Sequence, residues 1–124
     1  MLQTRFVVHE HNAKKAGLHH DLRIEMNGVL LSFAIPKLID EKERRLALKV
    51  EDHAISYFDF EGTIEEGYGA GTVKIYDIGA CQVEQKKDGY KIEFFGTKIK
   101  GCWTLRSFAT GDDKYLFFKN RNSR

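Results

Sequence analysis

The chain of 124 residues lacks the features that mark several classes of protein. It has a single proline and two cysteines, Cys81 and Cys102, which lie far apart in the sequence. A cysteine-based metal motif is therefore excluded, no disulfide framework is expected, and both thiols are predicted to be packed. No apolar run approaches the length of a membrane span, and residues 1–5 lack the apolar core of a signal peptide. We therefore expect a reduced, cytoplasmic protein without membrane contact.

An excess of charge of one sign is also missing. The net charge is only +2, and the charged residues, 31% of the chain, are spread along it. This pattern argues against a histone-like binder and against disorder. Hydrophobic residues make up 42% of the chain, which is enough for one modest core. Because the chain has no linker or repeat, we expect one domain over residues 1–124, with an ordered core at about 5–120.

Alternating apolar and polar residues predict a mainly β fold. The candidate strands are Arg5–His11, His19–Met26, Val29–Ile35, Leu46–Glu51, Thr72–Tyr76, Gln82–Lys86, Tyr90–Phe94, Gly101–Phe108 and Tyr115–Lys119. Asn27-Gly28 and Asp88-Gly89 predict hairpin turns. A short helical turn is expected at Asp40–Arg45, where Glu43 stands at capping-box spacing from Asp40. The pattern favours a small antiparallel barrel or sandwich and leaves the choice between them open.

One predicted strand carries an unusual polar face. His19, Asp21, Arg23 and Glu25 alternate with largely apolar residues, so the four side chains share one side. Such groups are costly to bring together unless they are paired or bind something. An alternative interpretation is a surface ion pair between Asp21 and Arg23 beside solvated histidines.

The same polar face suits a divalent metal. His19 and Asp21 project in one direction and are ligand types preferred by manganese, iron and zinc. A third ligand is needed, and His11 and His53 are the candidates. Arg23 is placed to hold an anionic substrate through a bidentate phosphate contact.

Two further segments stand out. Glu51-Asp52-His53 ends a predicted strand, and Tyr57 follows four residues after the histidine. The segment Gly67-Tyr68-Gly69-Ala70-Gly71 is rich in glycine but has neither Rossmann nor P-loop spacing. It therefore predicts a tight turn that needs positive φ rather than a phosphate cradle.

Taken together and in this order, these segments resemble the phosphoesterase domain of DNA ligase D, including its free-standing archaeal versions. The similar stretches are Phe6–His11, Leu18–Glu25, Gly28–Leu30, Ala34–Lys37, Arg45–Ala47, Val50–His53, Asp59–Gly62, Gly69–Val73 and Lys100–Trp103. The resemblance therefore covers nearly the whole chain, and its most specific parts surround His19 and His53.

The resemblance implies both a fold and an activity. The fold is a small antiparallel β-barrel of about eight strands with short flanking helical segments. The activity is manganese-dependent, with cobalt or zinc as alternative metals, and acts on DNA 3′ ends such as those of a primer–template. One reaction removes a terminal ribonucleoside and leaves a 3′-phosphate, and the other removes that phosphate and leaves a 3′-hydroxyl for strand-break repair. A separate ligase and polymerase of an end-joining system are the expected partners.

The resemblance also assigns residues to the site. Those that match its metal ligands are His11, His19 and Asp21. Those that match phosphate-engaging or catalytic residues are Arg23, His53, Tyr57, Arg45 and Lys37. The remaining polar residues nearby, expected as supporting neighbours, are His9, His20, Glu25 and Glu51.

Longer family members carry an N-terminal arm with further substrate contacts, whereas this chain begins almost at its first predicted strand. Removal of a 3′-phosphate is therefore expected more firmly than removal of a ribonucleoside.

Two other functions fit parts of the sequence. An iron oxygenase would use His19, Asp21 and His53 as a two-histidine, one-carboxylate triad, and would leave His11 outside the metal shell. A non-catalytic module for nucleic-acid ends would use basic residues along the DNA backbone, although a solvated face explains them equally. These basic residues are Lys98, Lys100, Arg106, Lys119 and Arg121. The single tryptophan, Trp103, is predicted to lie in the core.

Overall fold

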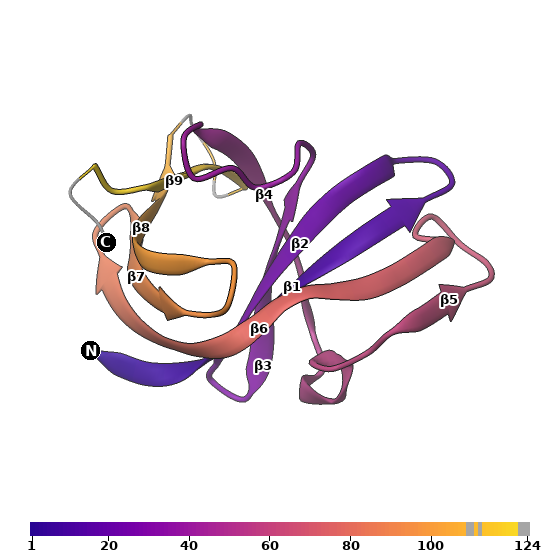
Figure 1. Ribbon diagram of the computed structural model, residues 1–124, viewed down its shortest axis with the longest axis horizontal. Coiled ribbons are helices and arrows are strands. Elements are labelled where there is room, and N and C mark those ends of the chain that lie inside the picture. Colours follow the sequence, from indigo (N-terminus) through magenta and orange to yellow (C-terminus); the bar gives the residue numbers. More distant parts are fainter. Residues whose placement is uncertain (109–110, 112, 122–124) are drawn as a thin grey trace.

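The computed structural model describes residues 1–108, 111 and 113–121, which form an almost wholly β structure (Figure 1). Its strands are β1 (Leu2–Ala13), β2 (Gly17–Met26), β3 (Val29–Ile35), β4 (Arg45–His53), β5 (Gly62–Ile64), β6 (Gly71–Lys86), β7 (Gly89–Phe95), β8 (Lys100–Ser107) and β9 (Lys114–Lys119). Within the described residues the one helical element is η1, a 3-10 turn at Ile55–Tyr57. No helix in this part of the chain is long and apolar enough to cross a membrane.

Eight of the nine strands close into an antiparallel barrel. The order around the ring is β1-β2-β3-β4-β9-β8-β7-β6, and β6 pairs back with β1. The ninth strand, β5, pairs with the start of β6 outside the ring. In Figure 1 the ends of β1, β2 and β6 run beyond the ring towards β5. The predicted small antiparallel β-barrel is confirmed.

Local turn chemistry fixes the two predicted hairpins. Asn27 and Gly28 both have positive φ, 54° and 81°, which matches the twist of a two-residue turn between β2 and β3. The second hairpin joins β6 to β7, with Lys86 paired to Gly89 across Lys87 and Asp88. The sequence therefore located both hairpins, although the second turn is Lys87-Asp88 and the predicted turn residue Gly89 is the first residue of β7.

One predicted break in a strand is wrong. The segments Thr72–Tyr76 and Gln82–Lys86 belong to the single 16-residue strand β6. Opposite Val8 and His9 the register of β6 shifts and leaves Tyr76 as an extra residue. Such a bulge bends the strand and increases its twist, so β6 can follow β1 and then turn along β7.

The short helical turn predicted at Asp40–Arg45 is a single hydrogen-bonded turn and not a helix. The Glu43 N–H bonds to the Asp40 carbonyl, and the Lys42 N–H bonds to the Asp40 carboxylate. The capping residue is therefore used as predicted, but the segment closes only one turn before β4 begins at Arg45. The short elements η1 and β5 were not predicted.

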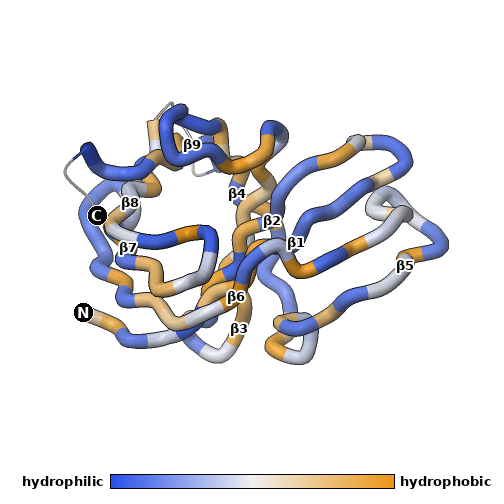
Figure 2. Tube along the Cα trace, viewed as in Figure 1, coloured by the Kyte–Doolittle hydropathy of each residue, from blue (hydrophilic) through white to orange (hydrophobic). Residues whose placement is uncertain are grey.

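Two apolar clusters lie on opposite sides of the sheet. The larger fills the barrel and includes Trp103 stacked on Phe117, their ring centroids 4.8 Å apart, which confirms Trp103 as a core residue. Cys81 belongs to the same cluster, and its burial raises the pKa of the thiol to about 12. The smaller cluster, Val7, Leu30 and Phe58, lies outside the barrel with η1 packed against it. Figure 2 shows the alternation of hydrophobic and hydrophilic residues that gives many strands two distinct faces.

A buried aspartate, Asp77, anchors one end of the barrel. Its carboxylate accepts hydrogen bonds from the backbone N–H groups of Ile78, Thr97, Lys98 and Ile99 at 2.7–3.0 Å. These bonds tie the turn between β7 and β8 to β6. The donors are all backbone groups, so Asp77 has a structural role.

Candidate active site

The residues predicted as metal ligands lie on the face of β1 and β2 that points away from the barrel core. In the antiparallel register His11 is opposite His19, and His9 is opposite Asp21. Residues directly opposite in such a pair share one face of the sheet. Leu22, which lies between Asp21 and Arg23 on β2, points into the barrel. Strand pairing thus gathers three imidazoles and a carboxylate on the outer face.

His11, His19 and Asp21 form a compact group with ligand atoms within 4.8 Å of one another. The Nδ1 atom of His11 lies 3.3 Å from one Asp21 carboxylate oxygen, and Nε2 of His19 lies 3.2 Å from the other. All three residues are at most 9% exposed. The predicted third ligand, His11, is therefore brought to the group.

Backbone carbonyls orient both histidine rings. Nε2 of His11 lies 2.7 Å from the Gly69 carbonyl, and Nδ1 of His19 lies 3.1 Å from the Gly17 carbonyl. A carbonyl only accepts, so each of these nitrogens carries the proton in a neutral ring. With a metal bound, the lone pairs would then lie on the two nitrogens that face Asp21, whereas without a metal a proton on these nitrogens is donated to the Asp21 carboxylate. A histidine held through its other nitrogen is the usual arrangement around a bound metal.

The electrostatics of the group favour a cation. Burial opposes the charge of Asp21, but hydrogen bonds from His11 and His19, together with Arg23, hold the pKa of this carboxyl well below its usual range. The hydrogen bond to Asp21 in turn raises the pKa of His19. Two imidazoles and a carboxylate fit manganese, iron, cobalt or zinc. The donor set therefore fits a divalent metal.

Arg23 is buried beside this group, and its guanidinium is fixed on several sides. Nε donates to Nδ1 of His9 at 3.2 Å, and Nη2 lies 3.6 Å from the Asp21 carboxylate. The guanidinium carbon lies 5.0 Å from the centre of the Tyr57 ring. A cation held in this way reaches a substrate with little further loss of side-chain freedom.

His9, predicted as a supporting neighbour, accepts the hydrogen bond of Arg23. The side chain is fully buried, and burial, reinforced by Arg23, lowers its pKa to about 4. The ring is therefore neutral at pH 7 and can accept the Arg23 hydrogen bond. The Nε2 atom of His9 has no hydrogen-bond partner of good geometry among the described residues. The Phe60 carbonyl nevertheless partly offsets the fall in the pKa of His9.

His53 and Tyr57 complete the polar group. Nη1 of Arg23 lies 3.2 Å from Nδ1 of His53, and the Glu51 carbonyl lies 3.0 Å from the same nitrogen. Burial and Arg23 lower the pKa of His53, so its ring is mostly neutral at neutral pH. The Tyr57 ring lies 5.1 Å from that of His53 and stacks on Phe60 at 4.9 Å. Burial raises the pKa of the Tyr57 phenol, which keeps it protonated.

Six of the predicted site residues line one pocket of about 450 Å³. Its polar wall consists of His11, His19, Asp21, Arg23, His53 and Tyr57, and its apolar wall of Ala13, Ala16, Ala34, Pro36, Leu48, Val50 and Ile64. Tyr68 and Gly69 of the glycine-rich segment close the rim, where Tyr68 is 75% exposed. The glycine-rich segment is a turn, with positive φ at Gly67 and Gly71.

Two other predicted site residues, Arg45 and Lys37, do not line this pocket. Nε of Arg45 donates to the Leu38 carbonyl at 2.8 Å, and its Nη2 lies 3.9 Å from Asp40. Arg45 is thus held by the turn that precedes β4. Lys37 is exposed and directly follows Pro36 of the pocket wall.

Two residues predicted as supporting neighbours point elsewhere. His20 faces the other side of β2, where Nδ1 accepts the Ile39 N–H and Nε2 lies 3.4 Å from Glu10. Glu25 pairs with Arg5 at 2.6 Å. The period-2 pattern of the strand already separated His20 from the polar face.

Fold and site together define a class, namely small antiparallel β-barrels with a candidate divalent-metal centre beside a buried arginine and a histidine on the outer face. A family model of the DNA Ligase D 3′-phosphoesterase domain matches residues 9–107. The chain belongs to this family, and the resemblance found in the sequence is confirmed.

Several relatives carry the same name in different bacteria. The Multifunctional non-homologous end joining protein LigD of Mycolicibacterium smegmatis is 49% identical over 84 residues, covering 65% of this chain and 11% of that protein. Its namesake in Pseudomonas aeruginosa is 40% identical over 110 residues, covering 82% of the chain and 13% of the relative. The Mycobacterium bovis protein is 35% identical over 127 residues, covering 96% of this chain and 16% of that protein. The chain thus spans less than a fifth of the length of these relatives.

Proposed function

We propose that the chain is a metal-dependent phosphoesterase that removes the 3′-phosphate from DNA ends and leaves a 3′-hydroxyl. One observation carries the proposal: a His-His-Asp metal-binding group and the Arg23–His53 pair line the same pocket, in a chain of the 3′-phosphoesterase family. A site with an anchored cation beside a metal centre suits an anionic phosphate ester.

His11, His19 and Asp21 would hold the metal, and we favour manganese. When bound there, a divalent metal polarises a phosphate oxygen and lowers the pKa of a bound water. The chain contributes the orientation of its ligands through the Gly17 and Gly69 carbonyls. Cobalt and zinc suit the same donors.

Arg23 and His53 would engage the phosphate. Nδ1 of His53 can accept from Arg23 or donate to the Glu51 carbonyl, but one ring nitrogen cannot do both. With Arg23 as partner, Nε2 of His53 carries the proton and can donate a hydrogen bond to an oxygen of the ester. Tyr57 holds both side chains by packing and presents its phenol in the pocket.

The overall reaction balances as a hydrolysis. Water adds to phosphorus, the bond from phosphorus to the 3′ oxygen breaks, and the products are inorganic phosphate and a 3′-hydroxyl. The attacking water releases one proton as its oxygen adds to phosphorus, and this proton balances the one that the departing 3′ oxygen takes up, while the Nε2–H of His53 hydrogen-bonds the ester. Phosphate binding by Arg45 and Lys37 stays a prediction, because neither lines the pocket.

A second activity and the partners belong to the same proposal. Removal of a 3′-terminal ribonucleoside to leave a 3′-phosphate would use the same pocket. The matched relatives are named multifunctional end-joining proteins, and the chain spans 11–16% of them. Ligase and polymerase activities would therefore come from separate chains or other parts of a longer one, acting on DNA ends in the cytoplasm.

The test is an end-conversion assay on a labelled primer–template that ends in a 3′-phosphate or in one 3′-ribonucleotide. Wild type, His19→Ala and His53→Ala are incubated with manganese or with EDTA. Asp52→Asn is the matched control, because Asp52 is an exposed carboxylate next to His53 that pairs with Lys49. We expect manganese-dependent formation of a 3′-hydroxyl by wild type and Asp52→Asn, and loss in both histidine variants.

Conversion in EDTA, or full activity of His19→Ala, would contradict a metal-dependent site. Tight binding of the ends without turnover in manganese would favour the non-catalytic module. The oxygenase alternative leaves His11 outside the metal shell, whereas the ligand atoms of His11, His19 and Asp21 lie within 4.8 Å of one another, which supports the proposed ligand set. Loss of metal from a His11→Ala variant would count against that alternative.

A further inference from the structure

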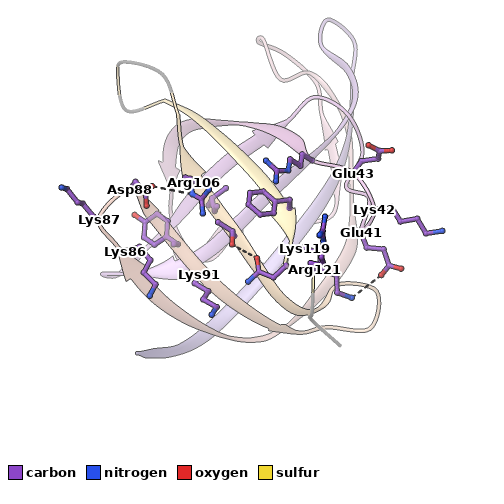
Figure 3. A pocket seen from close by; sticks show the side chains of 16 residues that line it. Glu41, Lys42, Glu43, Lys86, Lys87, Asp88, Lys91, Arg106, Lys119 and Arg121 are labelled. Atoms are coloured by element: carbon purple, nitrogen blue, oxygen red, sulfur yellow. Dashed lines mark hydrogen bonds and ion pairs between the residues drawn. The ribbon is translucent and has the colours of Figure 1, made fainter.

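A second and larger hollow, of about 960 Å³, lies away from the candidate active site. It runs over the outer face of β8 and β9, and the 41–44 turn and the β6–β7 hairpin bound it (Figure 3). It shares no lining residue with the active-site pocket. In the ring order, β8 and β7 lie across the barrel from β2 and β3, so the two hollows are on opposite walls.

The groove concentrates positive charge. Eight basic residues line it against three acidic ones, a surplus of five positive charges, whereas the whole chain has a net charge of +2. The basic residues are Lys42, Arg44, Lys86, Lys87, Lys91, Arg106, Lys119 and Arg121. The rest of the molecule is therefore net negative, and the groove is the strongly basic region.

Much of this charge has no internal partner. Three of the eight form ion pairs: Arg106 with Asp88 at 3.7 Å, Lys119 with Glu41 at 3.5 Å, and Lys86 with Glu84 at 2.9 Å, of which the first two are drawn in Figure 3. The basic residues without a carboxylate at ion-pairing distance, within the part of the chain that the structure describes, are Lys42, Arg44, Lys87, Lys91 and Arg121. Exposed lysine and arginine in this number attract a polyanion.

An aromatic side chain lies among these cations. The guanidinium carbons of Arg44 and Arg106 lie 4.6 and 5.8 Å from the centre of the half-buried Phe118 ring. Thr104 and Asn120, joined by a 2.6 Å hydrogen bond, add neutral polar groups to the floor of the groove. Phosphate-binding cations around an aromatic platform are the combination by which proteins hold single-stranded nucleic acid.

We propose that this groove is a second DNA-binding surface that holds a single strand by its phosphates and stacks one base on Phe118. The choice of DNA rests on the proposed function, but the site is separate from the catalytic pocket. A strand held on the opposite wall is not the end being hydrolysed. The groove therefore keeps the protein on DNA independently of end chemistry.

Three of the basic residues considered in the sequence, Arg106, Lys119 and Arg121, line this groove. Lys98 and Lys100 do not, and the Lys98 ammonium instead lies 4.3 Å from the centre of the Tyr76 ring. Lys100 is exposed and thus offers a matched control.

The test is fluorescence anisotropy with a labelled oligodeoxythymidylate that ends in a 3′-hydroxyl, in EDTA. Circular single-stranded DNA, which has no ends, and polyglutamate serve as competitors. The variant Arg44→Glu/Arg106→Glu is compared with Lys74→Glu/Lys100→Glu, which changes net charge equally at exposed sites outside the groove. Phe118→Leu keeps the apolar bulk but removes the aromatic face. Thermal melts check that each variant is folded.

We expect the groove double variant to bind at least about tenfold more weakly and with a flatter salt dependence, and the control to change less than about twofold. Phe118→Leu should lose about fivefold through stacking. Circular DNA should compete well and polyglutamate poorly. Equal losses in both double variants, equal competition by polyglutamate, or no binding at about 50 mM salt would overturn the proposal. Turnover in the end-conversion assay is scored separately, so either conclusion can fail without the other.

Discussion

Two aspartates of this protein, Asp21 and Asp77, are each 5% exposed, yet their surroundings differ. The Asp77 carboxylate accepts four backbone N–H groups, and none of these hydrogen bonds comes from a side chain. The Asp21 carboxylate meets His11, His19 and Arg23, all of them side chains that bind ligands elsewhere in proteins. Burial alone therefore does not distinguish the two carboxylates, whereas the donors around them do: backbone groups hold Asp77, and side chains that could share a metal surround Asp21.

The two carboxylates also differ in whether they leave room for a ligand. Asp77 is satisfied by the chain itself, which leaves no lone pair in need of a ligand. Asp21 is held ionised by groups that line an open pocket, so a metal can take the place of protons there. Substitutions at these two positions should therefore affect different properties.

The largest effect is expected from Asp21→Asn. The amide keeps the volume but is a poor ligand for a divalent metal, so turnover of a 3′-phosphate should fall roughly a thousandfold, about 4 kcal/mol in the barrier. Asp52→Asn is the control and should retain activity. Steady-state assays in manganese measure the difference, and a variant with more than a tenth of the wild-type rate would remove Asp21 from the site.

The next effect is on stability and comes from Asp77→Asn. An amide NH₂ turned towards backbone N–H groups leaves several buried donors unsatisfied, so the free energy of unfolding should fall by about 3 kcal/mol. Urea denaturation gives this value, with exposed Asp59→Asn as the control, expected to stay within about 0.5 kcal/mol of wild type. If Asp77→Asn were as stable as wild type, the assignment of Asp77 as the structural aspartate would be wrong.

A smaller effect is expected at His9, which accepts a hydrogen bond from Arg23. His9→Phe keeps an aromatic ring but leaves the Arg23 Nε without its partner, so kcat should fall about tenfold while manganese affinity changes less than about twofold. His9→Asn, whose carbonyl oxygen can accept at the same place, should restore part of the rate. Loss of metal binding in His9→Phe would show that the residue supports the metal group instead.

The smallest effect is expected at Tyr68, the exposed aromatic residue on the pocket rim. Tyr68→Ala should raise KM for DNA ends about fivefold through lost stacking, with kcat within about twofold. Tyr68→Phe should behave as wild type because the ring is kept. An unchanged KM in Tyr68→Ala would exclude a substrate contact at the rim.

The fold was predictable where its cause is local. Val29–Ile35 was found with its exact bounds because Asn27-Gly28 fixes the turn before it. The continuous strand β6 was missed because its bulge depends on pairing with β1, about 70 residues away in sequence. The three-residue strand β5 is too short to show a period-2 pattern.

The site was predictable to a similar degree. The alternation in β2 and the family resemblance together identified His11, His19 and Asp21, which the structure brings into one group. The Gly69 carbonyl that orients His11 was not found, because every residue has a carbonyl and this one lies 58 positions away. His9 was named only as a supporting neighbour, because its contact with Arg23 depends on the pairing of β1 with β2.

The most direct test of the difference between the two aspartates is a manganese titration of metal-free protein, followed by the loss of the electron paramagnetic resonance signal of free Mn²⁺. Wild type and Asp77→Asn, measured under conditions where both are folded, should each bind one equivalent. Asp21→Asn should leave the free-ion signal unchanged up to one equivalent. Stoichiometric binding by Asp21→Asn, or its loss in folded Asp77→Asn alone, would contradict the assignment of the outer face of β1 and β2 as the metal centre.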